Sequence, residues 1–166
     1  LLKEMVLQGR LDMTVTYQFE PSPGIVEQPL FNEMIYLVSP VGSGIKPRDQ
    51  GMSIAEVAKL PLFLSSRQTG MRRIVQAGLA AHGLTIEPLA EVDSLRTLVD
   101  AVETGNAHTI LPASALQKQL KSLADRPLVI NALDISRNVV LCTSEHLPLG
   151  AAATAACIAV DRPLVL

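Results

Sequence analysis

The sequence contains very few aromatic residues, with three Phe, two Tyr and no Trp among 166 residues. Apolar residues nevertheless make up 48% of the chain, so its core must be built from Leu, Val, Ile and Ala rather than from rings. Charged residues amount to 18%, below the usual share of about a quarter. This combination is typical of strands buried on both faces of a parallel sheet, and also fits a surface that a partner covers.

Basic runs, disulfide patterns and membrane-spanning stretches are missing too. The formal net charge is −2, and the only adjacent basic pair, Arg72-Arg73, is too short to follow a phosphate backbone, so we do not expect this segment to bind nucleic acid by itself. Cys142 and Cys157 lie in apolar surroundings without CxxC spacing, which predicts buried free thiols and a reducing, cytoplasmic location. The apolar tract from Leu149 to Val160 is too short to span a membrane and suits a buried helix.

The motifs that would indicate catalysis are absent as well. There is no GxSxG nucleophile elbow, no Walker-type phosphate loop and no GxGxxG dinucleotide fingerprint. His82, His108 and His146 have no second ligand at helical spacing, and no pair of carboxylates is set up for acid–base work. We therefore predict no catalytic residue, no metal site and no cofactor, and we expect that the chain is not an enzyme.

Helices and strands alternate along nearly the whole chain, which predicts an α/β fold of the doubly wound type. Gly9 ends the first helix as a left-handed cap, and Ser53 to Glu56 form a capping box before a later one. The first helix has no capping residue before it, so we expect that residues upstream of Leu1 are missing. The predicted strands span residues 12–17, 25–30, 33–39, 62–65, 86–92, 109–111, 127–132 and 138–143, and later helices span 71–82, 95–104, 113–124 and the residues after 148.

Three places at strand ends are candidates for ligand binding. The loop that contains Ser65, Ser66 and Arg67 supplies hydroxyls and a guanidinium directly before a helix, and helix N-termini favour anions. An ordinary solvated loop that caps its helix explains these residues equally well. Thr16 and Tyr17 end the strand after Gly9, where edge packing is the simpler explanation. Gly105 and Pro112 bracket a short strand, and a plain helix-to-strand connection explains the segment between them best.

Several segments resemble the effector-binding domain of LysR-type transcriptional regulators. GRLDMTV, from Gly9 to Val15, resembles the family's G-x-L-D-hydrophobic segment. GIVEQPLFNEMIYLV, from Gly24 to Val38, resembles its two strands joined at PL…E. EVDSLRTLVDAVETGNAHTILP, from Glu91 to Pro112, resembles its stretch from D-S through a helix to Gly and a strand ending in Pro. The resemblance covers nearly the whole chain in order, and LLKEMVLQGRLDM is similar to regulators of nitrogen assimilation control.

The resemblance implies two α/β lobes of the periplasmic-binding-protein-like type with a ligand cleft between them, and with the N-terminal strand and turn of the first lobe missing. By position, it implies ligand contacts at Tyr17, next to the candidate Thr16, and at Ser65 or Ser66 with Arg67 adjacent. The first lobe would comprise residues 1–60 with 129–166 and the second residues 61–128, because Pro61 and Pro127 mark the two crossings.

The resemblance also implies the effector-sensing domain of a cytoplasmic bacterial regulator that binds a small, anionic metabolite and associates as a homodimer or homotetramer. Such a protein would contact DNA only through a helix-turn-helix that this sequence lacks, and would not contact a membrane. The alternative is a periplasmic-type solute-binding protein for a small anion, which would need a signal peptide upstream. An enzyme such as a prephenate-dehydratase-like protein would need titratable groups that converge in one pocket.

Overall fold

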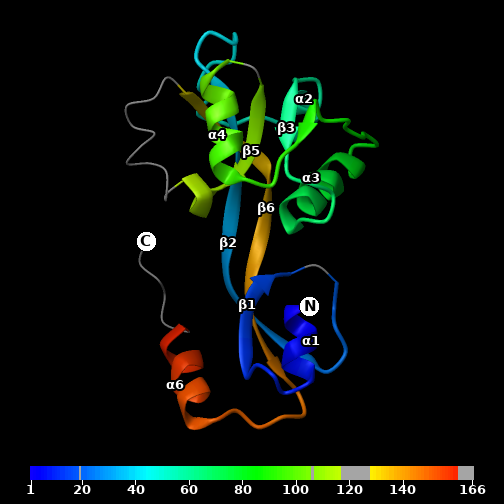
Figure 1. The fold of residues 1–166 in the computed structure, drawn as a ribbon, viewed down its shortest axis with the longest axis vertical. Coiled ribbons are helices and arrows are strands. Elements are labelled where there is room, and N and C mark those ends of the chain that lie inside the picture. Colours follow the sequence, from blue (N-terminus) through cyan, green and yellow to red (C-terminus); the bar gives the residue numbers. More distant parts are fainter. Residues whose placement is uncertain (19, 106, 117–127, 161–166) are drawn as a thin grey trace. The chain divides into compact units, whose positions relative to one another are not determined.

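The computed structural model describes residues 1–18, 20–105, 107–116 and 128–160, and Figure 1 shows its course. Helices and strands alternate over much of the chain, as predicted. The elements are α1 (Leu2–Leu7), β1 (Met13–Tyr17), β2 (Ile25–Pro40), α2 (Ile54–Val57), β3 (Leu62–Leu64), α3 (Gly70–Ala80), β4 (Ala90–Glu91), α4 (Leu95–Glu103), β5 (His108–Pro112), β6 (Leu128–Ser144) and α6 (Ala151–Val160).

Two long strands replace four predicted short ones. The strands predicted over 25–30 and 33–39 are one continuous β2, and those predicted over 127–132 and 138–143 are one β6. No glycine or proline separates the members of either pair, so nothing in the sequence ends the extended backbone there. The strand predicted over 86–92 is in fact only Ala90–Glu91. The helix predicted over 113–124 is described only for residues 113–116, which are helical.

The chain divides into two compact units, residues 1–32 with 137–166 (unit 1) and residues 33–136 (unit 2). Strands β2 and β6 each have residues in both units. The boundaries predicted between the lobes lie near residues 60–62 and 128–130. They therefore differ from the boundaries between the units, which lie at 32/33 and 136/137. Pro61, which suggested the first crossing, lies inside unit 2 directly before β3.

Strand pairing is mixed within unit 2 and antiparallel in unit 1. In unit 2 the neighbouring strands follow the order β6-β2-β5-β3-β4, with β3 parallel to both β4 and β5 and β2 antiparallel to β5. In unit 1, β1 runs antiparallel to β6 in a register that pairs Met13 with Thr143 and Tyr17 with Val139. The carboxyl ends of the parallel strands β3 and β4 therefore lie at the same edge of the sheet.

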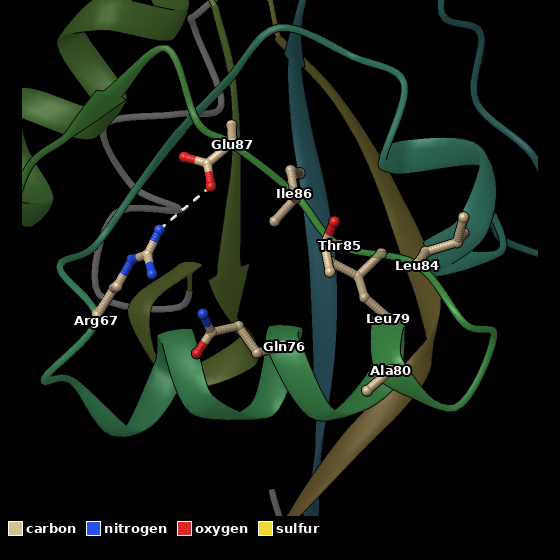
Figure 2. Close-up of a pocket in the computed structure, with 8 residues that line it drawn as sticks. All are labelled: Arg67, Gln76, Leu79, Ala80, Leu84, Thr85, Ile86 and Glu87. Carbon is tan, nitrogen blue, oxygen red and sulfur yellow. Dashed lines mark hydrogen bonds and ion pairs between the residues drawn. The ribbon is translucent and has the colours of Figure 1, made fainter.

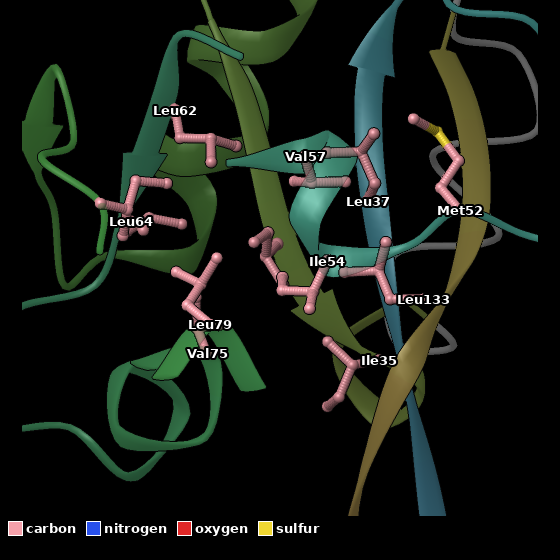
Figure 3. Packing of buried hydrophobic residues seen from close by; sticks show 12 residues of the cluster. Ile35, Leu37, Met52, Ile54, Val57, Leu62, Leu64, Val75, Leu79 and Leu133 are labelled. Atoms are coloured by element: carbon pink, nitrogen blue, oxygen red, sulfur yellow. The ribbon is translucent and has the colours of Figure 1, made fainter. Parts of the chain in front are cut away.

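Two aliphatic clusters form the core of unit 2. Leu37 and Ile110 belong to the first cluster, whereas their chain neighbours Val38 and Leu111 belong to the second. Because successive residues of a strand point to opposite faces, the sheet is buried on both sides. The first cluster contains no aromatic residue, as the composition predicts, and includes the labelled residues of Figure 3 from α2, α3 and the strands.

Several local predictions are confirmed. Gly9 follows α1 with a φ of 68°. In the capping box of α2, the Ser53 hydroxyl accepts from the Ala55 N–H at 3.1 Å and the Glu56 carboxylate accepts from the Ser53 N–H at 3.1 Å. The Arg48 guanidinium and the Ser53 N–H, which both donate to its carboxylate, lower the pKa of Glu56.

The prediction for the last helix is only partly right. Of α6, Ala153 is buried but Ile158 is 63% exposed, so it is not the buried helix that its composition predicts.

Cys142 is buried and Cys157 partly buried, and both are free thiols. In the part of the chain that the structure describes, every helix is too short or too polar to cross a membrane.

Gly51 makes a backbone contact that no other residue type can make without strain. Its φ is 72°, and a Cβ at this position would lie 2.5 Å from the carbonyl oxygen of Ala132. The same carbonyl accepts from the Met52 N–H at 2.8 Å, which joins the chain to β6. Gly51 is therefore required both for its dihedral angle and for the close approach of two backbone segments.

Replacing Gly51 by Ala should destabilise the chain more than the same change at Gly44, which also has a positive φ but has nothing within 4 Å. We expect Gly44→Ala to cost about 1–2 kcal/mol for the left-handed backbone alone. Gly51→Ala should cost a further 1–3 kcal/mol or so because the methyl group overlaps a carbonyl. Urea unfolding of both variants measures the difference, and equal losses would contradict this account.

Candidate functional site

The loop from Ser65 to Thr69 connects β3 to α3 and is held by its own hydroxyl groups. Thr69 is the N-cap of α3, and its hydroxyl oxygen accepts from the Arg72 N–H at 3.2 Å. The same hydroxyl donates to the Ser66 carbonyl at 3.0 Å and lies 2.7 Å from the Ser65 hydroxyl. The loop is therefore an ordered turn directly at the N-terminus of an 11-residue helix.

Charged side chains surround this turn. The Ser66 N–H donates to the Asp93 carboxylate at 2.8 Å. The Arg67 guanidinium lies 3.3 Å from the Glu87 carboxylate and 3.8 Å from that of Glu91. The Arg67 side chain is 61% exposed, and exposed ion pairs contribute little to stability, so an incoming anion can replace them at low cost.

Arg67 also lines a pocket of unit 2 with a volume of about 280 Å³. Figure 2 shows the ion pair of Arg67 and Glu87 at one end of this pocket, with Leu79, Ala80 and Leu84 at the other. Ser65 and Ser66 do not line it. Of the three predicted contact residues in unit 2, Arg67 is therefore the one that lines this pocket, and it is also the charged one.

Thr16 and Tyr17 lie in unit 1, at the end of β1, and pair with Val140 and Val139 of β6. Both are partly buried. The Arg137 guanidinium lies over the Tyr17 ring, 3.6 Å from its centroid, and Arg137 is itself buried. This cation–π contact occupies one face of the ring and fixes the orientation of the tyrosine.

Polar side chains of α1, β2, β6 and the residue after β1 are linked in unit 1. The Asn138 side chain donates to Gln18 at 3.0 Å and accepts from Asn32 at 2.8 Å. Gln18 in turn donates to Glu27 at 3.3 Å, and Glu27 forms an ion pair with Lys3. The three amides, the Glu27 carboxylate and Lys3 thus form one chain of polar contacts in unit 1.

A scan against protein-family models matches residues 1–160 to the LysR substrate binding domain. The chain belongs to this family. It is 36% identical over 114 residues to the nitrogen assimilation regulatory protein nac of Klebsiella aerogenes and 31% identical over 115 residues to that of Escherichia coli. Each alignment covers 69% of this chain and 36% of the relative, so the matched segment spans about a third of the relatives' length.

Solved structures of LysR-type regulators share the fold. Reduced OxyR of N. meningitidis gives a TM-score of 0.77 at 22% identity and covers 98% of this chain and 76% of its own. The effector binding domain of QuiR in complex with shikimate gives 0.74 at 15% identity, covering 95% and 73%. The regulatory domain of Synechocystis CcmR in complex with 2-PG gives 0.75 at 13% identity, covering 95% and 76%. The periplasmic-binding-protein-like α/β class predicted for this LysR domain is therefore confirmed.

The structure of this LysR domain also shows two arginines that the sequence analysis does not single out as ligand-binding candidates. Arg72 is buried on α3 together with Val75 and Leu79, and its spacing of three and seven residues from them places it on the apolar stripe. That spacing is visible in the sequence and is a usable signal. Arg137, by contrast, meets Tyr17 only through the pairing of β1 with β6, which no local pattern encodes.

His108 is a buried histidine of this LysR domain with a structural partner. Its Nδ1 lies 2.8 Å from the Ser39 hydroxyl, and the burial of the ring lowers the pKa of His108 from its usual 6.5. His82 is exposed at the end of α3, with its Nδ1 3.0 Å from the Gly78 carbonyl. Among the described residues, no group of His, Cys, Asp and Glu is arranged to hold a metal ion.

The lowered pKa of His108 predicts a dependence of stability on pH. The unfolded chain takes up a proton near pH 6.5, whereas the folded chain takes it up only at a lower pH. The contribution to stability is therefore fully present above pH 6.5 and is lost as the pH falls toward the folded pKa.

We expect the free energy of unfolding, measured in urea, to fall between pH 7.5 and pH 5.5. His108→Gln should flatten this slope, even if it lowers stability at every pH. An unchanged slope in the His108 variant would show that another group titrates.

Proposed function

We propose that the chain senses a small, anionic metabolite and so controls a LysR-type transcription regulator. The observation that carries this proposal is the turn from Ser65 to Thr69, where the carboxyl ends of β3 and β4, the N-terminus of α3 and the Arg67 guanidinium meet. Unsatisfied N–H groups at a helix N-terminus and a nearby cation together favour a bound anion.

The predicted contacts fall into two groups under this proposal. Ser65, Ser66 and Arg67 supply a hydroxyl, an N–H and a guanidinium in unit 2, which contact Thr69, Asp93 and Glu87 and which an anion would have to take over. Thr16 and Tyr17 offer two hydroxyls in unit 1, with the Tyr17 ring held by Arg137. Substituting each group separately tests whether both contribute to one affinity.

The comparisons support small-molecule sensing as the role of the domain. QuiR was solved with shikimate and CcmR with 2-PG, each in the domain that corresponds to this chain. For the whole protein we propose a cytoplasmic regulator that forms a homodimer or homotetramer and contacts DNA through an N-terminal helix-turn-helix. A solved complex of full-length CbnR with its target DNA is consistent with that arrangement.

The proposal predicts that anionic metabolites raise the melting temperature of the full chain, whereas neutral analogues of the same size do not. Arg67→Gln should weaken the binding of the stabilising anion roughly two- to tenfold, since its exposed charge interacts through solvent. The measurement is a thermal-shift screen followed by titration calorimetry.

A matched control is Arg96→Gln. Arg96 is 72% exposed on α4 and pairs only with Asp100 of its own helix among the described ion pairs, so this variant should bind like the parent. Tyr17→Phe and Thr16→Val test the second group. Equal stabilisation by neutral and anionic compounds, or by none, would refute the proposed function.

A further inference from the structure

Arg72 is a fully buried arginine in the first turn of α3. The residue is 1% exposed, and its side chain is 0% exposed. Its backbone N–H donates to the Thr69 cap, so the base of the side chain lies at the turn described above. The guanidinium of an arginine is a cation in proteins and has donors but no acceptor. The sheet edge therefore contains a permanent positive charge beneath its surface.

Only one nitrogen of this guanidinium has partners. Nη1 lies 3.5 Å from the Ser65 carbonyl oxygen and 3.5 Å from the Glu91 carboxylate. Nε and Nη2 are both buried, and within the described residues neither has a hydrogen-bond partner. Leaving two donors of a buried cation unpaired is costly, and such groups are rare in folded proteins.

The two unpartnered nitrogens are adjacent on the group. Nε–H and one Nη2–H of the planar guanidinium point in the same direction, as a fork with two parallel donors. A carboxylate or phosphate presents two oxygens at the matching separation and accepts both bonds at once. The unsatisfied edge thus has the geometry of one particular ligand group.

The head group is also close to solvent. Glu91, which contacts Nη1, is 40% exposed, so the Nη1 side of the guanidinium lies beside a partly exposed side chain. Glu91 is held from outside by Arg67 at 3.8 Å, an exposed and weak ion pair. An anion would have to displace these two side chains to reach the buried charge.

We propose that Arg72 is the buried anion-binding residue of this turn, with Nε and Nη2 donating to two oxygens of one carboxylate or phosphate group of the effector. The inference rests on the proposed function and deepens it: Arg67 lies at the entrance, and Arg72 makes the bidentate contact. Glu91 then competes with the ligand, because it places a like charge beside the same guanidinium.

The first experiment observes Arg72 directly in the unmodified full chain. With ¹⁵N-labelled arginine, the Nε–H signals are recorded by NMR while succinate or inorganic phosphate is added. We expect the Arg72 signal, assigned from its loss in Arg72→Lys, to shift to saturation with the same midpoint as the thermal stabilisation. The Arg96 signal should not move.

Two matched carboxylate variants separate Arg72 from Arg67. Among the described ion pairs, Glu91 contacts both arginines, whereas Glu87 contacts only Arg67, at 3.3 Å. If Arg72 binds the anion, Glu91→Gln should tighten binding roughly three- to tenfold and clearly more than Glu87→Gln. If Arg67 alone binds it, Glu87→Gln should tighten binding at least as much, because it lies closer to that residue.

The Arg72 variants complete the test. Arg72→Lys keeps the charge but has no fork, so it should lose about tenfold or more in affinity for succinate. Should this variant not fold, it cannot assign the Arg72 signal, and the two glutamate variants decide the matter.

A stationary Arg72 signal, with oxyanion binding that depends on Arg67 and is equally sensitive to both glutamates, would overturn this inference and leave the proposed function standing. No response to any oxyanion in any assay would overturn both.

Discussion

The sheet of unit 2 is covered on both faces, and this constraint decides where charge can lie. Leu37 and Ile110 pack into one cluster and Val38 and Leu111 into the other, so a charge in mid-strand would be buried without water. Strand ends escape this limit, because the chain turns there and backbone polar groups are available. The polar turn after β3 and Glu91 at the end of β4 both lie where the fold tolerates charge.

Two buried polar side chains in unit 2 show the difference between structural and functional burial. His108 lies in β5 with its Nδ1 2.8 Å from the Ser39 hydroxyl, and its neutral form suits its buried surroundings. Arg72 is buried as well, and two of its nitrogens have no hydrogen-bond partner in the described part of the chain. A polar group that is satisfied within the fold requires no ligand, whereas one that is not is a candidate for binding one.

Local features of the fold were predictable, and features that depend on pairing were not. The capping box at Ser53 and the left-handed Gly9 follow from residue chemistry within a few positions, and both are confirmed. The continuity of β2 and β6 depends on partners far along the chain, so the short strands predicted there were wrong. The burial of Arg72 was predictable in principle from its spacing to Val75 and Leu79. An adjacent basic pair such as Arg72-Arg73 is more typical of surface charge, so the pair alone does not predict burial.

The charges around the turn determine how an anion is recognised there. The two guanidiniums of Arg67 and Arg72 are accompanied by three carboxylates, from Glu87, Glu91 and Asp93. These carboxylates cancel the long-range attraction, and salt screens what remains beyond about 10 Å. Affinity must then come from hydrogen bonds at contact distance, which are strongest where water is excluded. Water is excluded from the buried Arg72 but not from the exposed Arg67. Selectivity for an oxyanion therefore depends on how completely its two oxygens match the Nε and Nη2 donors of Arg72.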